Sequence, residues 1–274
     1  MQNINKFTKV EAGLIHFLPF KPSVKREKGF SVDRIHGEKV MSVKALESLN
    51  VVDFVVFVQM VNDYGQDPLK WRNAGKVEDR NLTKRTLDLA HMTRERVGNS
   101  DKRNREITAK CLERMSNLKI TIVDEQSTTH TWYIHQIKIA NDFTSAEVVV
   151  NEIFLLKCVN NGLVFDFGRL LNYGKNYYAV LLDSYLQGTK EREKINGRFK
   201  RNGKLFYRHK YEEEELFNTL FLDSTNMRYL DKHKIIKESF DTLHRVGKLP
   251  VYEFKKHEKT WERIKAKSSK GSVI

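Results

Sequence analysis

Residues 211–267 carry the pattern that decides the fold: YEEEELFNTLFLDSTNMRYLDKHKIIKESFDTLHRVGKLPVYEFKKHEKTWERIKAK. Residues 211–221 predict a helix, DSTNMRY a turn, and residues 230–246 a second, basic helix. The apolar positions of that second helix recur at helical spacing, at Ile235, Ile236, Phe240, Leu243 and Val246. After Gly247 and Pro250, VYEF and TWERIKAK flank the polar turn KKHEK and predict a β-hairpin. Helix, turn, basic helix and hairpin in this order describe a winged helix.

The same order occurs earlier in the chain. Residues 83–92 predict a short helix, and Ser100 and Asp101 offer N-cap side chains for a second helix, NREITAKCLERMSNL. LKITIV and TWYIHQIKI then flank the polar turn DEQSTTH as a hairpin. The sequence therefore predicts an α+β protein with two tandem winged-helix domains, related by architecture and not by sequence.

The remaining segments suggest a division of the chain. Residues 43–64 carry a broad apolar stripe that predicts a helix, and residues 65–80 read as a polar loop. We expect an N-terminal arm at 1–42, a first winged-helix domain at 43–188 and a second at 189–274. Short strands and helices, EVVVN, EIFLLK, LVFDF and YYAVLLDSYLQG, close the first domain.

The charge is strongly basic and unevenly distributed. The chain holds 49 Lys and Arg against 35 Asp and Glu, a net charge of +14. Residues 189–274 hold 22 of these cations and 13 of the anions, which gives +9 in 86 residues. Such a surplus favours a polyanionic partner, because neutralised phosphates release counterions. A ribosomal or membrane-surface protein would show the same balance, so charge alone does not identify the partner.

Cysteine content and hydropathy lead us to expect a cytoplasmic protein. Cys111 and Cys158 each lie in an apolar helical setting typical of small core residues. Asp53 interrupts the most apolar run, VVDFVVFVQMV, so no stretch reaches membrane-spanning length. The N-terminal MQNINKFTKVEAG lacks the apolar region of a signal peptide. We expect no membrane association.

Two stretches resemble a known family. EVVVNEIFLLK and LVFDFGRLLNYGKNYYAVLLDSYLQG resemble the end of the first winged-helix domain in plasmid replication initiators of the Rep_3 superfamily. The last 64 residues are similar to that family's second domain, with an acidic first helix and Tyr229 just before the basic helix. The resemblance covers roughly residues 43–268 and consists of architecture and scattered apolar positions.

The resemblance implies a function without catalysis. Such a protein binds short direct repeats of double-stranded DNA at an origin, helps to open the duplex and recruits host replication proteins, such as the host initiator and helicase. It also implies autorepression as a homodimer. We expect no cofactor and no metal. A winged-helix transcription regulator without a replication role fits nearly the same features and stays an alternative.

The second winged helix supplies the main candidate DNA contacts. If it docks as helix-turn-helix proteins do, the start of its basic helix enters the major groove. The candidates there are Asn226, Met227, Arg228, Tyr229, Lys232, His233, Lys234 and Lys237. The wing offers phosphate contacts at Lys255, Lys256, His257, Lys259, Arg263, Lys265 and Lys267. The alternatives are a solvated basic helix face and a general basic tail.

The first winged helix carries a weaker basic face. Its candidates are Lys102, Arg103, Arg105 and Lys110. They would contact a second groove one helical turn away, giving a footprint of about 20 bp. Alternatively this domain mainly dimerises, through its wing and strands. The sequence favours neither interpretation.

Catalytic interpretations find little support. His130 and His135 are five residues apart on a predicted strand, which places them on opposite faces. The chain lacks a G-x-x-x-x-G-K-[ST] phosphate loop. The run Glu212–Glu215 fits the solvated start of a helix, where acids favour the positive dipole end. We therefore expect no enzyme, with a relaxase or nuclease of unrecognised site as the remaining alternative.

Overall fold

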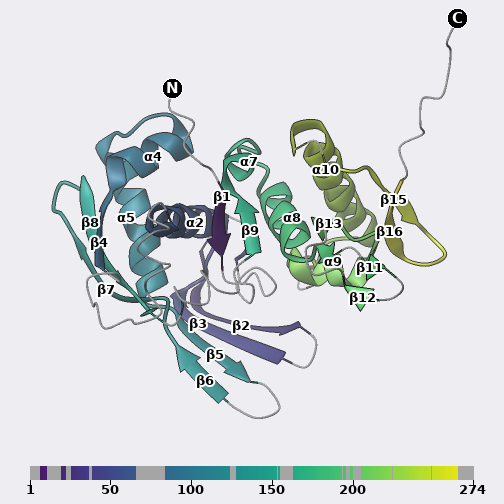
Figure 1. Ribbon diagram of the computed structural model, residues 1–274, viewed down its shortest axis with the longest axis horizontal. Helices are drawn as coiled ribbons and strands as arrows, with labels where there is room; N and C mark the ends of the chain where they lie inside the picture. Colours follow the sequence, from purple (N-terminus) through teal and green to yellow (C-terminus); the bar gives the residue numbers. More distant parts are fainter. Residues whose placement is uncertain are drawn as a thin grey trace, which may run out of the picture.

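The computed structural model contains two helix–helix–hairpin units side by side, the first on the left of Figure 1 and the second on the right. It describes residues 7–10, 20–22, 26–36, 39–65, 84–123, 128–152, 154, 163–192, 194–195, 198–199, 205–223, 225–247 and 249–264. The predicted fold class, α+β with two tandem winged-helix domains, is confirmed.

The first unit is built around a buried central helix, α2, which packs against α5, while α5 packs against α4. An apolar run wide enough to be buried on most sides explains its central position. The helices of this unit are α2 (Val51–Gly65), α4 (Leu89–Val97), α5 (Lys102–Ser116), α7 (Phe167–Leu171) and α8 (Tyr177–Gly188).

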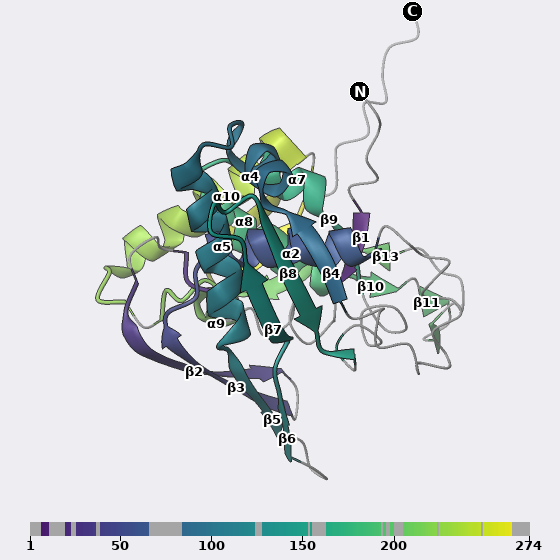
Figure 2. The same cartoon turned by 90° about the vertical axis from the view of Figure 1, so that its left-hand side faces the viewer.

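Antiparallel sheets surround these helices. One has the strand order β2-β3-β5-β6, a second the order β4-β8-β7, and β1 pairs with β9. Figures 1 and 2 both place the four-stranded sheet at the lower end of the molecule and α4 at the upper end. The strands are β1 (Phe7–Val10), β2 (Lys28–His36), β3 (Lys39–Glu47), β4 (Lys84–Asp88), β5 (Lys119–Val123), β6 (Thr128–Thr131), β7 (Ile134–Ile139), β8 (Ser145–Val150) and β9 (Leu163–Asp166).

The second unit contains a winged helix preceded by short strands. Its helices are α9 (Glu213–Thr219) and α10 (Tyr229–Gly247). The wing strands pair in the order β14-β16-β15, with bounds Lys210–Glu212, Thr260–Arg263 and Tyr252–Lys255. The preceding strands are β10 (Glu191–Arg192), β11 (Lys194–Ile195), β12 (Arg198–Phe199) and β13 (Leu205–Phe206).

The helix predicted at 43–64 is partly wrong. The chain continues as strand β3 to Glu47, and α2 starts only at Val51. Met41 and Val43 are buried at the two-residue spacing of a strand, whereas Leu46 is 73% exposed. Since β3 pairs with both β2 and β5, the expected boundary between residues 42 and 43 falls inside a strand of the first unit's sheet. The polar loop expected at 65–80 lies almost entirely outside the described residues.

The helix predicted at 83–92 also begins later than expected. Residues 84–88 form β4, which pairs with β8, and α4 starts at Leu89. The carboxylate of Asp88 accepts the backbone N–H of His91 at 2.9 Å, so this residue caps the helix and ends the strand. Leu87 and Leu89 are both buried although they lie on different elements, which made one helix look continuous.

The first hairpin is interrupted where one long strand was predicted. β6 pairs with β5, but β7 pairs with β8 in another sheet. Tyr133 lies between the two strands and is buried against the rings of Phe57 and Phe154, at centroid distances of 5.3 and 4.5 Å. Because this ring is buried in the core, the chain leaves the wing hairpin at Tyr133. His130 and His135 therefore lie on different strands, and the former shares a hydrogen bond with Thr121.

Helix α8 joins the two units. It packs against both α9 and α10, and its residues 179–188 are all buried. Inside this junction Arg169 donates to both oxygens of Asp183, at 2.8 and 2.7 Å, and to the hydroxyl of Tyr207 at 3.0 Å. Because Tyr207 lies in the second unit, this buried ion pair is shared by the two winged helices.

Candidate nucleic-acid interface

Helix α10 separates an apolar from a charged face. Ile236, Phe240 and Leu243 are buried, and Phe240 packs on the rings of Tyr252 and Trp261 in the wing strands. On the outward face, the side chain of Lys234 is 73% exposed and lies 3.8 Å from Glu238. At the end of the preceding turn and the start of the helix, the exposed residues are Asn226, Met227, Arg228, Tyr229 and Leu230. Lys237 is exposed further along the helix.

The side chain of Arg228 is exposed, but an ion pair fixes its orientation. Its guanidinium donates to both carboxylate oxygens of Asp231, at 2.9 and 3.3 Å, while its side chain stays 86% exposed. The hydrogen bond from Arg228 lowers the pKa of Asp231, so the carboxylate is charged across the physiological range. The pair holds the guanidinium at the entrance of α10, where a bidentate group can meet a base edge or a phosphate.

His233 was predicted as a DNA contact, but its ring faces the protein. Its Nε2 is hydrogen-bonded to Glu213 of α9, and the ring packs on Phe254, at 4.0 Å between centroids, and on Trp261. The Tyr229 hydroxyl donates to the same Glu213 carboxylate, at 2.9 and 3.0 Å. Glu213 therefore fixes the first two turns of α10, and the predicted solvated helix start is wrong for this residue.

Glu214 and Glu215, two other acids of the run Glu212–Glu215, also differ in their exposure and contacts. Glu214 is exposed, whereas Glu215 accepts from Arg208 at 2.6 Å and from the hydroxyl of Tyr185 in α8. Lys232, another predicted contact, is half-buried with its ammonium 5.9 Å from the ring centre of Phe217. Burial thus separates exposed from inward-facing charged side chains, although the sequence presents all of them as one charged patch.

The wing presents its predicted lysines at the turn. Lys255, Lys256, His257 and Lys259 are all exposed there. The backbone carbonyl of Lys259, a residue with φ of 51°, accepts the N–H of Glu213 at 3.0 Å, so the wing turn is tied to the start of α9. Arg263 is half-buried and donates to the Tyr207 carbonyl at 3.2 Å. Lys265 and Lys267 lie outside the described residues.

The first unit offers fewer open cations. Asp101 caps α5 by accepting the N–H of Asn104 at 2.8 Å, as predicted. Lys102 and Arg103 are exposed at the start of α5, but Arg105 donates to the carbonyls of Ser100 and Asp142. Lys110 forms an ion pair with Glu106 at 2.7 Å. Only part of the predicted basic face is therefore available to a partner.

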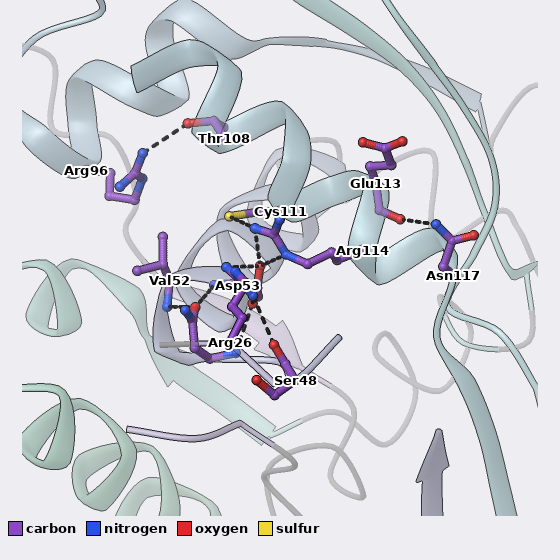
Figure 3. A network of polar contacts seen from close by, with 11 residues as sticks. Arg26, Ser48, Val52, Asp53, Arg96, Thr108, Cys111, Glu113, Arg114 and Asn117 are labelled. Carbon is purple, nitrogen blue, oxygen red and sulfur yellow. Dashed lines mark hydrogen bonds and ion pairs between the residues drawn. The ribbon is translucent and has the colours of Figure 1, made fainter. Parts of the chain in front are cut away.

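Sequence analysis missed the buried network beneath α5, shown in Figure 3. The carboxylate of Asp53 accepts from Arg26 at 2.7 Å and from Arg114 of α5 at 2.9 Å, and its side chain is completely buried. Arg114 also donates to the sulfur of Cys111, and burial raises the pKa of this thiol to about 12. The signal was present, because an aspartate inside an apolar helix needs a partner.

The described residues lack two features that would indicate other functions. These residues contain no group of three or more His, Cys, Asp or Glu side chains that could hold a metal ion. No helix in the described part of the chain is both long and apolar enough to cross a membrane.

The architecture places the chain in a structural class, proteins with two winged helices in tandem. Among solved structures, a selenomethionine derivative of domains 2 and 3 of RctB is similar, with a TM-score of 0.56 and 10% identity over 85% of this chain and 86% of that chain. A second structure of RctB domains 2–3 gives a TM-score of 0.51 and 13% identity over 84% and 83%. At these identities the likeness is one of fold. No protein-family model matches the sequence, and no curated protein does.

Proposed function

We propose that this chain is a plasmid DNA replication initiator that binds short direct repeats at an origin. In this proposal it helps to open the duplex, recruits host replication proteins and represses its own promoter. The support comes from the resemblance to Rep_3 initiators, from the tandem winged-helix fold and from the +14 charge. It works through binding energy and not through bond-making, in the cytoplasm and without a cofactor.

One observation carries the proposal. In the second unit the start of α10 and the wing turn expose cations on structures that are fixed to each other through Glu213. Arg228, Lys234 and Lys237 lie at the helix, and Lys255, Lys256 and Lys259 at the wing. In known helix-turn-helix complexes the helix start meets base edges, while lysines position the protein on phosphates.

The two parts of the chain have different proposed roles. The unit at 189–274 supplies the major-groove contacts. The first unit either adds contacts through Lys102 and Arg103 or dimerises the protein. Its central helix α2 is almost entirely buried, and its three- and four-stranded sheets leave long strands that support the dimerisation alternative.

Footprinting of the purified protein on DNA flanking its own gene tests the proposal. Protection of several evenly spaced direct repeats is the expected result, and the repeat spacing shows whether one or both units touch each repeat. Protection of a single inverted repeat over the promoter would favour the transcription regulator instead. A nicking assay on supercoiled DNA with Mg²⁺ or Mn²⁺ tests the remaining enzymatic alternative, and cleavage would contradict the proposed mechanism.

A further inference from the structure

Large apolar side chains gather at the start of α10, among the charged candidates. Leu230 is 76% exposed, Tyr229 51% and Met227 39%. A solvated leucine taken alone is ordinary on a protein surface. Three large side chains with exposed apolar surface within four residues, at the end of the helix that the proposed function places in the major groove, form a candidate apolar contact surface.

Helical geometry places Leu230 on the same side as the exposed lysines of α10. It precedes Lys234 by four residues and Lys237 by seven, so the three share one face of the helix. The buried stripe begins at Ile236, about 120° away around the helix axis. Leu230 therefore projects where the exposed lysines project and not towards the core.

This apolar surface is held in place. The Tyr229 hydroxyl is bound by the Glu213 carboxylate, and its ring lies 4.9 Å from the ring of His233 and 6.1 Å from that of Phe217. Arg228, between Met227 and Tyr229 in the chain, is bound to Asp231. Tyr229 and Arg228, next to Leu230 and Met227 in the chain, are thus held by contacts within the protein, which reduces the conformational entropy that these two side chains lose on binding.

The surroundings indicate a polyanionic partner with an apolar group. Lys234 and Lys237 lie on this face, with Glu238 3.8 Å from Lys234, and Arg228 directly precedes the helix in an ion pair with Asp231. The wing turn adds three more exposed lysines. In the major groove of DNA, thymine alone among the four bases presents a methyl group, and apolar side chains contact it.

We propose that Leu230, with Met227 beside it, contacts thymine methyl groups and is a specificity-determining residue of the DNA interface. The inference rests on the proposed DNA-binding function and adds to it one chemical requirement, thymine at the base pair facing the first turn of α10. Hydrogen-bonding residues read the neighbouring base pairs, whereas Leu230 reads a single carbon atom.

The test removes that carbon atom. Duplexes are first selected in vitro with the full-length protein from a random 30-bp pool, and the best binder is resynthesised with deoxyuridine replacing one thymine at a time. Deoxyuridine pairs like thymine but lacks the methyl group. For the wild-type chain we expect binding about fourfold weaker at one or two positions, the effect of losing one buried methyl group. Leu230→Ala should bind the thymine and deoxyuridine duplexes equally.

Two variants serve as controls. Leu46→Ala removes the equally exposed leucine of β3, which is 73% exposed and far from α10 in the sequence, and should keep the full response to deoxyuridine. Lys234→Ala should weaken binding to the thymine and deoxyuridine duplexes by the same factor. Thermal melting of each variant verifies folding.

The possible outcomes separate the two proposals. Equal binding of thymine and deoxyuridine duplexes by the wild type would overturn the role of Leu230 and leave the proposed function intact. A response that persists unchanged in Leu230→Ala would assign the methyl contact to another residue and overturn it as well. Failure to select any duplex would overturn the proposed function itself.

Discussion

The second helices of the two winged helices, α5 and α10, are held by buried acids at opposite ends. Arg114, in the last turn of α5, reaches Asp53 of α2. Tyr229 and His233, in the first two turns of α10, reach Glu213 of α9. In the first unit the anchor thus lies away from the helix start, and in the second unit it lies at the helix start.

This difference changes which residues remain for a partner. At the start of α5, Arg105 is used to hold the preceding turn, and only Lys102 and Arg103 are open. At the start of α10, the Glu213 carboxylate holds the side chains of Tyr229 and His233 from the protein side, and the side chains of Arg228 and Leu230 remain exposed. The two helices occupy the same position in their winged helices, but they differ in how many side chains at the helix start are available to contact a ligand.

Removing the anchor of α5 should have the largest effect. Asp53→Ala leaves the guanidinium groups of Arg26 and Arg114 without their carboxylate, in a site where Asp53 is completely buried. We expect the free energy of unfolding to fall by about 3–5 kcal/mol. Urea denaturation measures it, with Glu238→Ala in the exposed Lys234–Glu238 pair as a control that should change stability by less than about 0.5 kcal/mol. A loss similar to the control would mean that α5 is held by apolar packing alone.

The leading end of α10 should dominate DNA binding. Arg228→Ala combined with Lys234→Ala removes two base contacts, at about 1–3 kcal/mol each, and should weaken specific binding by about 30- to 25,000-fold. The lower half of that range applies if Arg228 has to leave Asp231 in order to bind. Fluorescence anisotropy on the footprinted repeat measures the change. A double variant with wild-type affinity would remove α10 from the interface.

Periodicity and turn residues were sufficient to predict both winged helices, because helix–helix–hairpin order depends on local patterns. They failed at β3 and β4, where a strand is followed closely by a helix and the two patterns merge. The pairing with β2, β5 and β8 that decides these strands comes from distant residues. No local signal could have supplied it.

The candidate site was predictable as a region but not residue by residue. The exposed lysines of α10 and the wing follow from sequence, whereas the inward turn of His233 depends on Glu213, Phe254 and Trp261. In the run Glu212–Glu215 no pattern distinguishes the buried anchor from its neighbours. Leu230 could have been found, because its position about 120° from Ile236 already places it outside the apolar stripe.

Removing the anchor of α10 should have a smaller effect than removing that of α5. Glu213→Ala deletes the acceptor of Tyr229 and His233 while both retain aromatic contacts, so we expect a stability loss of about 2 kcal/mol. Glu214→Ala is the matched control: it lies in the same helical turn, is exposed and loses the same helix-dipole interaction. Equal losses in the two variants, measured by urea denaturation, would show that Glu213 acts through the dipole and does not anchor α10.

Substitutions at the start of α5 should have the smallest effect, and their result distinguishes between the two proposed roles of the first unit. If Lys102 and Arg103 contact phosphates, Lys102→Ala with Arg103→Ala should lower the slope of log K against log salt by about 2, close to 0.9 for each phosphate that is no longer neutralised. The wild-type slope itself should correspond to fewer than about ten phosphates. Titrations at several salt concentrations provide both values.

Lys110→Ala is the control, because its ammonium is already paired with Glu106. An unchanged slope, together with dimers in sedimentation velocity, would assign the first unit to dimerisation, since its exposed cations would then face no phosphate.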